Sequence, residues 1–312
     1  MRSDATNYPT VRRFATTMFV GAALFAACDQ AAGPAPRGSP RGPTHTISAV
    51  DVSSLDGTVL DPPCVPAFVL DTWTLSADCT TMVTIQIPPG GTVEGNGHTI
   101  TAVDPPLGFR GAVLKASSGS TANVNNLGVT TSLTDAYGCF DGDDRLRGIL
   151  FDGASGNITN SRVITIKRGL SSGCQEGNGI EVRNFDGTGT KTVVIDNNVV
   201  RDYQKNGITA NGDLAVTITS NTVQGAGRVD YIAQNGIQFG FRATGDVRGN
   251  SITDNFYTGC SNRDAAKTGC TPYVAAGLLL YDIDPSSVRR STNTFINDQF
   301  NVLLVTHQSL DS

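Results

Sequence analysis

The sequence predicts an all-β solenoid, because its composition favours turns and strands and because one short motif recurs at a nearly constant spacing. The chain has 312 residues, of which 35 are Gly, 36 are Thr and 21 are Asn. Gly and Asn are common in turns, and the β-branched Thr favours strands over helix interiors. A hydrophobic content of 39% excludes a disordered chain. This composition disfavours helical bundles and doubly wound α/β folds.

An Asn-Gly-Ile motif marks the repeat. It occurs at 178–180, 206–208 and 235–237, and related Gly-Ile and Gly-Leu pairs occupy 148–149 and 277–278. The spacings between the glycines of these motifs are 31, 28, 29 and 41 residues. Periods of roughly 20 to 50 residues indicate a solenoid, in which each repeat forms one coil.

Stacking of the coils aligns equivalent side chains, because one coil cannot bury its own apolar face. We expect one interior row made by Ile180, Ile208 and Ile237. We expect a second interior row made by Val199, Val223 and Ile252. Two stacks of asparagine are expected at turns, one made by Asn198, Asn221 and Asn250 and the other by Asn178, Asn206 and Asn235.

The short strands, the turn residues and the spacing near 29 resemble the right-handed parallel β-helix of the pectin lyase-like superfamily. In that fold each coil contributes a few strands, and successive coils stack into long parallel sheets. Residues 83–103 look like its opening coil, and the resemblance extends to Val305. It implies a single-stranded solenoid of about eight coils over residues 83–312. Residues 47–82 are expected to form an N-terminal cap that covers the first sheet edges.

The N-terminus predicts export and a lipid anchor. Two arginines precede an apolar run at 14–27, which is too short to span a bilayer and is typical of a secretory signal peptide. The sequence Phe-Ala-Ala-Cys at 25–28 resembles the lipobox of bacterial lipoproteins, which implies cleavage before Cys28 and lipidation of that residue. Ordinary signal peptidase cleavage nearby is the alternative. Residues 1–27 are thus assigned to the signal peptide and the Pro/Gly-rich residues 28–46 to a flexible tether.

The six cysteines that follow Cys28 predict disulfides. An even number of cysteines in an exported chain is typical of a disulfide framework. Pairing between sequence neighbours gives Cys64–Cys79, Cys139–Cys174 and Cys260–Cys270, and other connectivities stay open. A zinc site is disfavoured, because no two cysteines lie within four residues and the chain has only three histidines.

An acidic loop at 139–147 is the first candidate site. The carboxylates of Asp141, Asp143 and Asp144 could bind Ca²⁺, which prefers oxygen ligands. The resemblance implies a polysaccharide lyase or epimerase in which calcium neutralises a uronate while Arg145 or Arg147 acts as the base. A solvated loop held by the Cys139–Cys174 disulfide is the alternative. The motifs of polygalacturonase-like hydrolases and a catalytic histidine are missing, which argues against an enzyme.

Two similar turns before consecutive Asn-Gly motifs form the second candidate site. Aromatic faces next to polar groups are typical of sugar-binding grooves. The residues predicted to bind a ligand are Arg201, Asp202, Tyr203, Lys205, Asp230, Tyr231 and Gln234. Packing of repeated turn residues explains the same pattern and is the alternative.

The net charge of −5 and the lack of a basic stripe argue against a nucleic-acid partner. We expect an exported β-helix in the cell envelope, anchored to a membrane in the periplasm or at the cell surface. Its side surface would bind a polysaccharide or a protein partner without catalysis. A Ca²⁺-dependent lyase or epimerase acting on an acidic polysaccharide is the alternative, and Ca²⁺ is the one cofactor considered.

Overall fold

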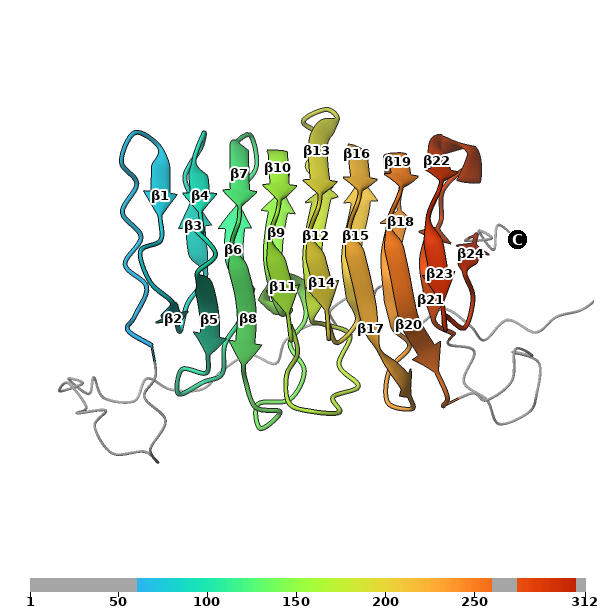
Figure 1. Ribbon diagram of the computed structural model, residues 1–312, viewed down its shortest axis with the longest axis horizontal. Helices are drawn as coiled ribbons and strands as arrows, with labels where there is room; N and C mark the ends of the chain where they lie inside the picture. Colours follow the sequence, from blue (N-terminus) through green and yellow to red (C-terminus); the bar gives the residue numbers. More distant parts are fainter. Residues whose placement is uncertain (1–60, 260–273, 307–312) are drawn as a thin grey trace, which may run out of the picture. The chain divides into compact units, whose positions relative to one another are not determined.

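The computed structural model describes residues 61–259 and 274–306, and these residues form three parallel β-sheets. They all belong to one compact unit, Thr46–Ser312. Each sheet has eight strands, and each strand pairs in parallel with the strand three places later in the chain (Figure 1). Three consecutive strands, one in each sheet, therefore make one coil. The all-β class is confirmed, and the topology is that of a parallel β-helix-like solenoid.

The strand boundaries define the three sheets. Sheet 1 contains β1 (Thr72–Thr74), β4 (Thr92–Glu94), β7 (Thr121–Asn125), β10 (Ser155–Thr159), β13 (Lys191–Asp196), β16 (Leu214–Thr219), β19 (Thr244–Arg248) and β22 (Val288–Ser291). Sheet 2 contains β2 (Cys79–Thr81), β5 (Thr99–Val103), β8 (Gly128–Ser132), β11 (Arg162–Ile164), β14 (Val199–Arg201), β17 (Thr222–Val229), β20 (Ser251–Tyr257) and β23 (Thr294–Ile296). Sheet 3 contains β3 (Ile85–Ile87), β6 (Ala112–Ala116), β9 (Arg147–Asp152), β12 (Asn178–Asn184), β15 (Asn206–Gly212), β18 (Asn235–Gly240), β21 (Ala276–Tyr281) and β24 (Val302–Val305).

Helical structure in the described residues is limited to two 3-10 turns. They are η1 (Gly142–Asp144) and η2 (Pro285–Ser287). Within the same ranges, no helix has the length and apolar character needed to cross a membrane.

The first predicted interior row is confirmed. Ile180, Ile208 and Ile237 are register partners on β12, β15 and β18, and all three are fully buried. Ile149 and Leu278 extend the row at its two ends. Parallel strands in register stack identical side chains, so each coil buries the apolar face of its neighbour.

The second predicted interior row is wrong by one residue at its first position. Val200 pairs with Val223, which in turn pairs with Ile252. Val200 is fully buried, whereas Val199 is only partly buried. A shift of one residue moves a side chain to the opposite face of a strand. The Val199–Val200 pair offers two apolar residues in succession, so alternation alone does not determine which one faces inward.

The first predicted asparagine stack is confirmed and continues for one further residue. The backbone N–H and the Nδ2 of Asn198 both donate to Oδ1 of Asn221, at 2.9 and 3.0 Å. Asn221 donates to Asn250 in the same way, and Asn250 donates to Asn293. These asparagines satisfy buried backbone groups at the turn between sheets 1 and 2.

The second predicted asparagine stack forms only in part. Nδ2 of Asn235 donates to Oδ1 of Asn206 at 3.0 Å. Asn178 instead donates to Glu181 within its own strand, at 2.7 Å. The glycine that follows each of these asparagines is required by close approach between coils. At Gly207 a Cβ atom would lie 2.6 Å from the carbonyl oxygen of Gly236.

Two of the three predicted disulfides are present. Cys64 is bonded to Cys79, and Cys139 is bonded to Cys174. The predicted Cys260–Cys270 bond and the lipidation site Cys28 lie outside the described residues, as do the predicted signal peptide and tether. The two observed disulfides indicate an extracytoplasmic protein, because such bonds persist in oxidising compartments.

Candidate functional site

Each carboxylate of the acidic loop has its own cationic partner. The ion pairs are Asp141 with Arg145 at 2.6 Å, Asp143 with Arg183 at 2.5 Å, and Asp144 with Arg110 at 2.9 Å. The hydrogen bond from Arg183 lowers the pKa of Asp143. Over residues 61–259 and 274–306, no group of three or more His, Cys, Asp or Glu side chains gathers in a way that could hold a metal ion. The three carboxylates are neutralised by side chains of the protein, and the predicted calcium site does not assemble.

Arg147 has a structural position rather than that of a base. Only 3% of the residue is exposed, and its Nε lies 2.7 Å from the carboxylate of Glu181. Its terminal nitrogens donate to the carbonyl oxygens of Arg145 and Gly142, at 2.8 and 3.2 Å. A buried guanidinium held by a carboxylate and two carbonyls cannot accept a proton from a substrate. The expectation that Arg147 acts as a base is therefore wrong.

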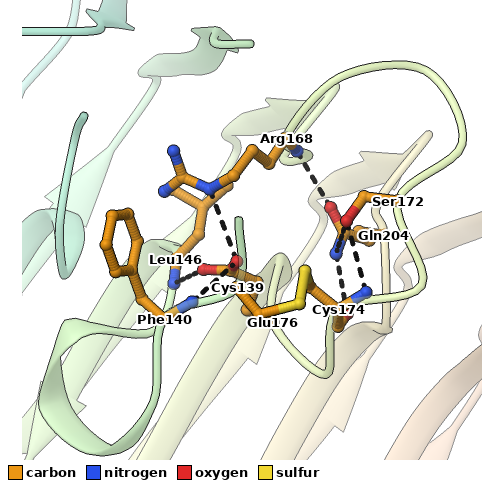
Figure 2. Close-up of a disulfide and its surroundings, with 8 residues drawn as sticks. All are labelled: Cys139, Phe140, Leu146, Arg168, Ser172, Cys174, Glu176 and Gln204. Carbon is orange, nitrogen blue, oxygen red and sulfur yellow. Dashed lines mark hydrogen bonds and ion pairs between the residues drawn. A yellow bond between two sulfur atoms is a disulfide. The ribbon is translucent and has the colours of Figure 1, made fainter. Parts of the chain in front are cut away.

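The disulfide Cys139–Cys174 fastens the acidic loop over a buried ion pair (Figure 2). The backbone N–H groups of Phe140 and Leu146 donate to the carboxylate of Glu176, at 3.3 and 2.9 Å. Nε of Arg168 lies 3.4 Å from the same carboxylate. Neither charged side chain is exposed to solvent.

The guanidinium of Arg168 has three further partners. It donates to the carbonyl oxygen of Phe109 at 2.6 Å, stacks 4.6 Å from the ring centroid of Phe140, and lies 3.6 Å from the carboxylate of Asp104. The motifs of the sequence do not predict this cluster. One sequence feature points to it, because Glu176 stands two residues before its Asn-Gly motif, as Gln204 does in the next coil. Gln204 is also buried and donates to the carbonyl oxygen of Cys174 at 2.7 Å.

The two tyrosine turns do not form the expected groove. Tyr203 is 1% exposed, and its hydroxyl donates to Oδ1 of Asn255 at 2.5 Å. Burial raises the pKa of Tyr203 well above its ordinary value. Gln234 is fully buried and donates to the carbonyl oxygen of Tyr203 at 2.6 Å. These two residues belong to the core, so the prediction that they contact a ligand is corrected.

The other predicted residues of these turns lie nearer the surface. Asp202 forms an ion pair with Lys167 at 2.8 Å, and Nζ of Lys205 donates to the carbonyl oxygen of Ala233 at 2.9 Å. Arg201 and Asp230 are exposed, and Tyr231 is half-buried. Burial, followed by the charges of Asp202 and Asp230, raises the pKa of Tyr231.

A row of three aromatic side chains lies on the outer surface at the ends of sheet 3 strands. We call Phe185, Phe241 and Tyr281 the aromatic row. The ring centroids of Phe185 and Phe241 are 6.0 Å apart, and those of Phe241 and Tyr281 are 5.3 Å apart, both with edge-to-face geometry. Phe185 is 59% exposed, and the other two residues are partly exposed. Contiguous apolar side chains at a surface mark binding sites more often than isolated ones do.

A glycine occupies the coil between the first two rings of the row. Phe185 follows β12 and Phe241 follows β18, so the coil that contains β15 lies between them. At this level the intervening coil has Gly212, which pairs with Asn184 and has φ of 90°. A Cβ atom there would collide with the carbonyl group of Asn184. The intervening coil therefore has no side chain at the position that follows Asn211.

The backbone beneath the row is strained. Phe241 and the following Arg242 both have left-handed backbones, with φ of 53° and 78°. Residues other than glycine and asparagine disfavour the left-handed region, and each such residue costs about 1–3 kcal/mol. Arg242 is held outward by a bidentate pair with Asp213, at 2.8 and 3.1 Å. Leu70 and Asp71 form another consecutive pair with left-handed backbones, so strain of this kind is not confined to the aromatic row.

An open depression adjoins the aromatic row. Its volume is about 510 Å³, and it is lined by Arg242, Thr244, Asp282, Ile283, Asp284, Ser287 and Thr306. It shares Arg242 with the strained segment, and Asp282 directly follows Tyr281. Rings, carboxylates and hydroxyls are thus combined on one surface. The sequence does not predict the aromatic row, since its members are 56 and 40 residues apart and share no motif.

Comparisons with known proteins assign no family to the chain. A scan against protein-family models finds no match, and a search of curated proteins finds no relative.

Proposed function

We propose that this protein binds a glycan along the aromatic row, without catalysis, as an exported β-helix of the cell envelope. The aromatic row is the observation that carries the proposal. Edge-to-face rings from three nearby coils offer apolar surface to sugar rings, while Arg242 and the carboxylates of the depression can bond sugar hydroxyls.

A lyase or epimerase has less support. That reaction would need a calcium ion and a base in the acidic loop, but the loop carboxylates are paired with arginines and Arg147 is buried. A protein partner is the other occupant considered for the side surface. The polar depression beside the rings favours a sugar, since it supplies several acceptors for hydroxyl groups.

The test is the Phe241→Ala variant in a glycan panel measured by titration calorimetry. Removal of one stacked ring should weaken the binding of whichever glycan the wild type binds by at least about tenfold, the equivalent of about 1.4 kcal/mol. Tyr137→Ala is the matched control, because Tyr137 is a partly exposed aromatic residue of the loop before Cys139. Unchanged glycan affinity in Phe241→Ala would overturn the proposal. If the wild type binds a protein partner and none of the glycans, the protein partner would be favoured as the occupant of this surface.

We further infer a right-handed solenoid of eight coils that resembles the pectin lyase-like superfamily. The eight strands of each sheet support the number of coils, and the nearly universal right-handedness of parallel crossovers supports the hand. We also infer an N-terminal cap within the predicted range 47–82. Residues 61–71 support it, since Cys64 and Pro62 bond to the backbone of Thr80, at 2.7 and 2.8 Å. The strands β1 and β2 of the same range belong to the sheets instead.

Location is tested separately from binding. We infer a lipid anchor at Cys28 after removal of a signal peptide at 1–27. Cys28→Ser should move the protein from the membrane fraction to the soluble fraction of cells. Unchanged partitioning of the variant would remove the lipid anchor and leave the glycan proposal standing.

A further inference from the structure

The surroundings of the aromatic row are negatively charged. Three carboxylates border it, and they are those of Asp213, Asp282 and Asp284. Asp213 directly follows Gly212, and Asp282 directly follows Tyr281. Arg242 lies among them and is paired with Asp213. Three negative groups and one positive group give these four residues a formal charge of −2.

Two of these carboxylates have lowered pKa values. The hydrogen bond from Arg242 lowers the pKa of Asp213, and the backbone N–H of Ser286 lowers the pKa of Asp284. These two groups therefore remain ionised near neutral pH.

The one arginine of this surface is already engaged. Nε and one terminal nitrogen of Arg242 donate to the two oxygens of Asp213. A bidentate pair of this kind matches the geometry with which arginine would grip a carboxylate of a ligand. A uronate would have to displace Asp213 to gain the same pair. Sugar hydroxyls make no such demand, because they can donate to the ionised carboxylates as they stand.

We infer that the aromatic row selects uncharged glycans and discriminates against polyuronates, an inference that rests on the proposed glycan binding. The rings supply stacking that is independent of charge. The bordering carboxylates accept hydroxyl hydrogen bonds from a neutral chain and repel a chain of carboxylates. Repulsion between charges near a surface weakens with added salt, so the discrimination should be greatest at low ionic strength.

The experiment compares xylan oligosaccharides with oligogalacturonides of equal length, using the whole folded domain in titration calorimetry at low and high salt. The neutral oligosaccharide should bind at least about tenfold more tightly at low salt, and the ratio should shrink as salt rises. Asp213→Asn, which frees Arg242, should lower the ratio by about threefold or more. Asp78→Asn is the matched control, because this exposed aspartate lies between β1 and β2 and should leave the ratio unchanged.

The possible outcomes distinguish a failure of the charge selection from a failure of the proposed glycan binding. Binding that depends on Phe241 but favours the galacturonide at low salt would overturn the charge selection and keep the glycan site. An equal effect of Asp213→Asn and Asp78→Asn on the ratio would also overturn it. A failure of Phe241→Ala to change the affinity for either sugar would overturn the glycan site itself.

Discussion

In the acidic loop each of the three carboxylates is matched by an arginine of the same chain, whereas the aromatic row turns a 59% exposed phenylalanine to solvent. The loop covers the buried pair of Arg168 and Glu176 and is fastened by a disulfide. The row lies on a strained backbone at Phe241. We expect the loop to contribute to stability and the row to reduce it. A charged cluster that looks catalytic can be structural, while the surface proposed for binding is formed by residues that share no motif.

Arg168→Ala should have the largest effect and should test the structural half of this comparison. It leaves Glu176 and Asp104 without their buried cation, so we expect a loss of about 3–5 kcal/mol in the free energy of unfolding. Urea denaturation measures this loss. Arg162→Ala is the control, because Arg162 is an exposed residue of β11 and should change stability by less than about 0.5 kcal/mol. Equal losses in both variants would contradict a structural role for the cluster.

Removal of the loop disulfide should have the next largest effect. The Cys139→Ser/Cys174→Ser double variant opens a link across 35 residues, and we expect a loss of about 2–4 kcal/mol. The folded variant should keep the wild-type glycan affinity, since the aromatic row shares no residue with the loop. A fall in that affinity with the fold intact would break the separation between the two regions.

Arg242→Gly tests the cost of the row. Glycine adopts the left-handed backbone without a steric penalty, while the lost ion pair is exposed and contributes little. We expect stability to rise by up to about 1 kcal/mol and glycan binding to weaken. Arg289→Gly is the matched control, since Arg289 forms a similar exposed pair with Asp246 from an extended strand, and there glycine should destabilise. Destabilisation by both variants would show that the row stores no strain.

The smallest effects should appear in the pH dependence of stability. Burial raises the pKa of Asp298 to about 6, above the unfolded value of about 3.9. Its contribution is therefore present below about pH 4 and is lost as the pH rises to about 6. Asp143 has a lowered pKa, so its contribution is present above about pH 4 and is lost on acidification.

The Asp298→Asn and Asp143→Asn variants test these opposite signs. Asp298→Asn should remove the fall in thermal midpoint between about pH 4 and pH 6, and Asp143→Asn should remove part of the fall below about pH 4. Asn255 still has an acceptor in the first variant, because it donates to Oδ1 of Asp298. The same sign of change in both variants would contradict the two assignments.

Much of the fold could be predicted from the sequence because the solenoid repeats its own signals. Each Asn-Gly-Ile motif combines an interior isoleucine with a glycine at a close contact, so Ile180, Ile208 and Ile237 were placed correctly. Val199 was misplaced because two adjacent valines leave the phase of a strand open. The polar neighbours of Tyr203 predict a surface position, although its ring is buried in the core.

The candidate site was harder to predict than the fold. The aromatic row depends on strand register and on an empty position at Gly212, and neither leaves a local motif in the chain. The acidic loop has the opposite property, since its composition is conspicuous but its charges are cancelled by Arg110 and Arg183, which are distant in the sequence. Pairing between distant residues is what a single sequence reports least.

In the stack from Asn198 to Asn293, the geometry of each turn is independent of the number of residues in the coil. Its three links join residues that are 23, 29 and 43 positions apart, yet each link is the same pair of hydrogen bonds at 2.9–3.0 Å. Extra residues in a coil must therefore be inserted in its loops, because the asparagine turn has a fixed length. The protein can accept new loops of very different size without shifting the strands that follow. We expect that such loops can be exchanged between coils, because the asparagines maintain the register of every later coil.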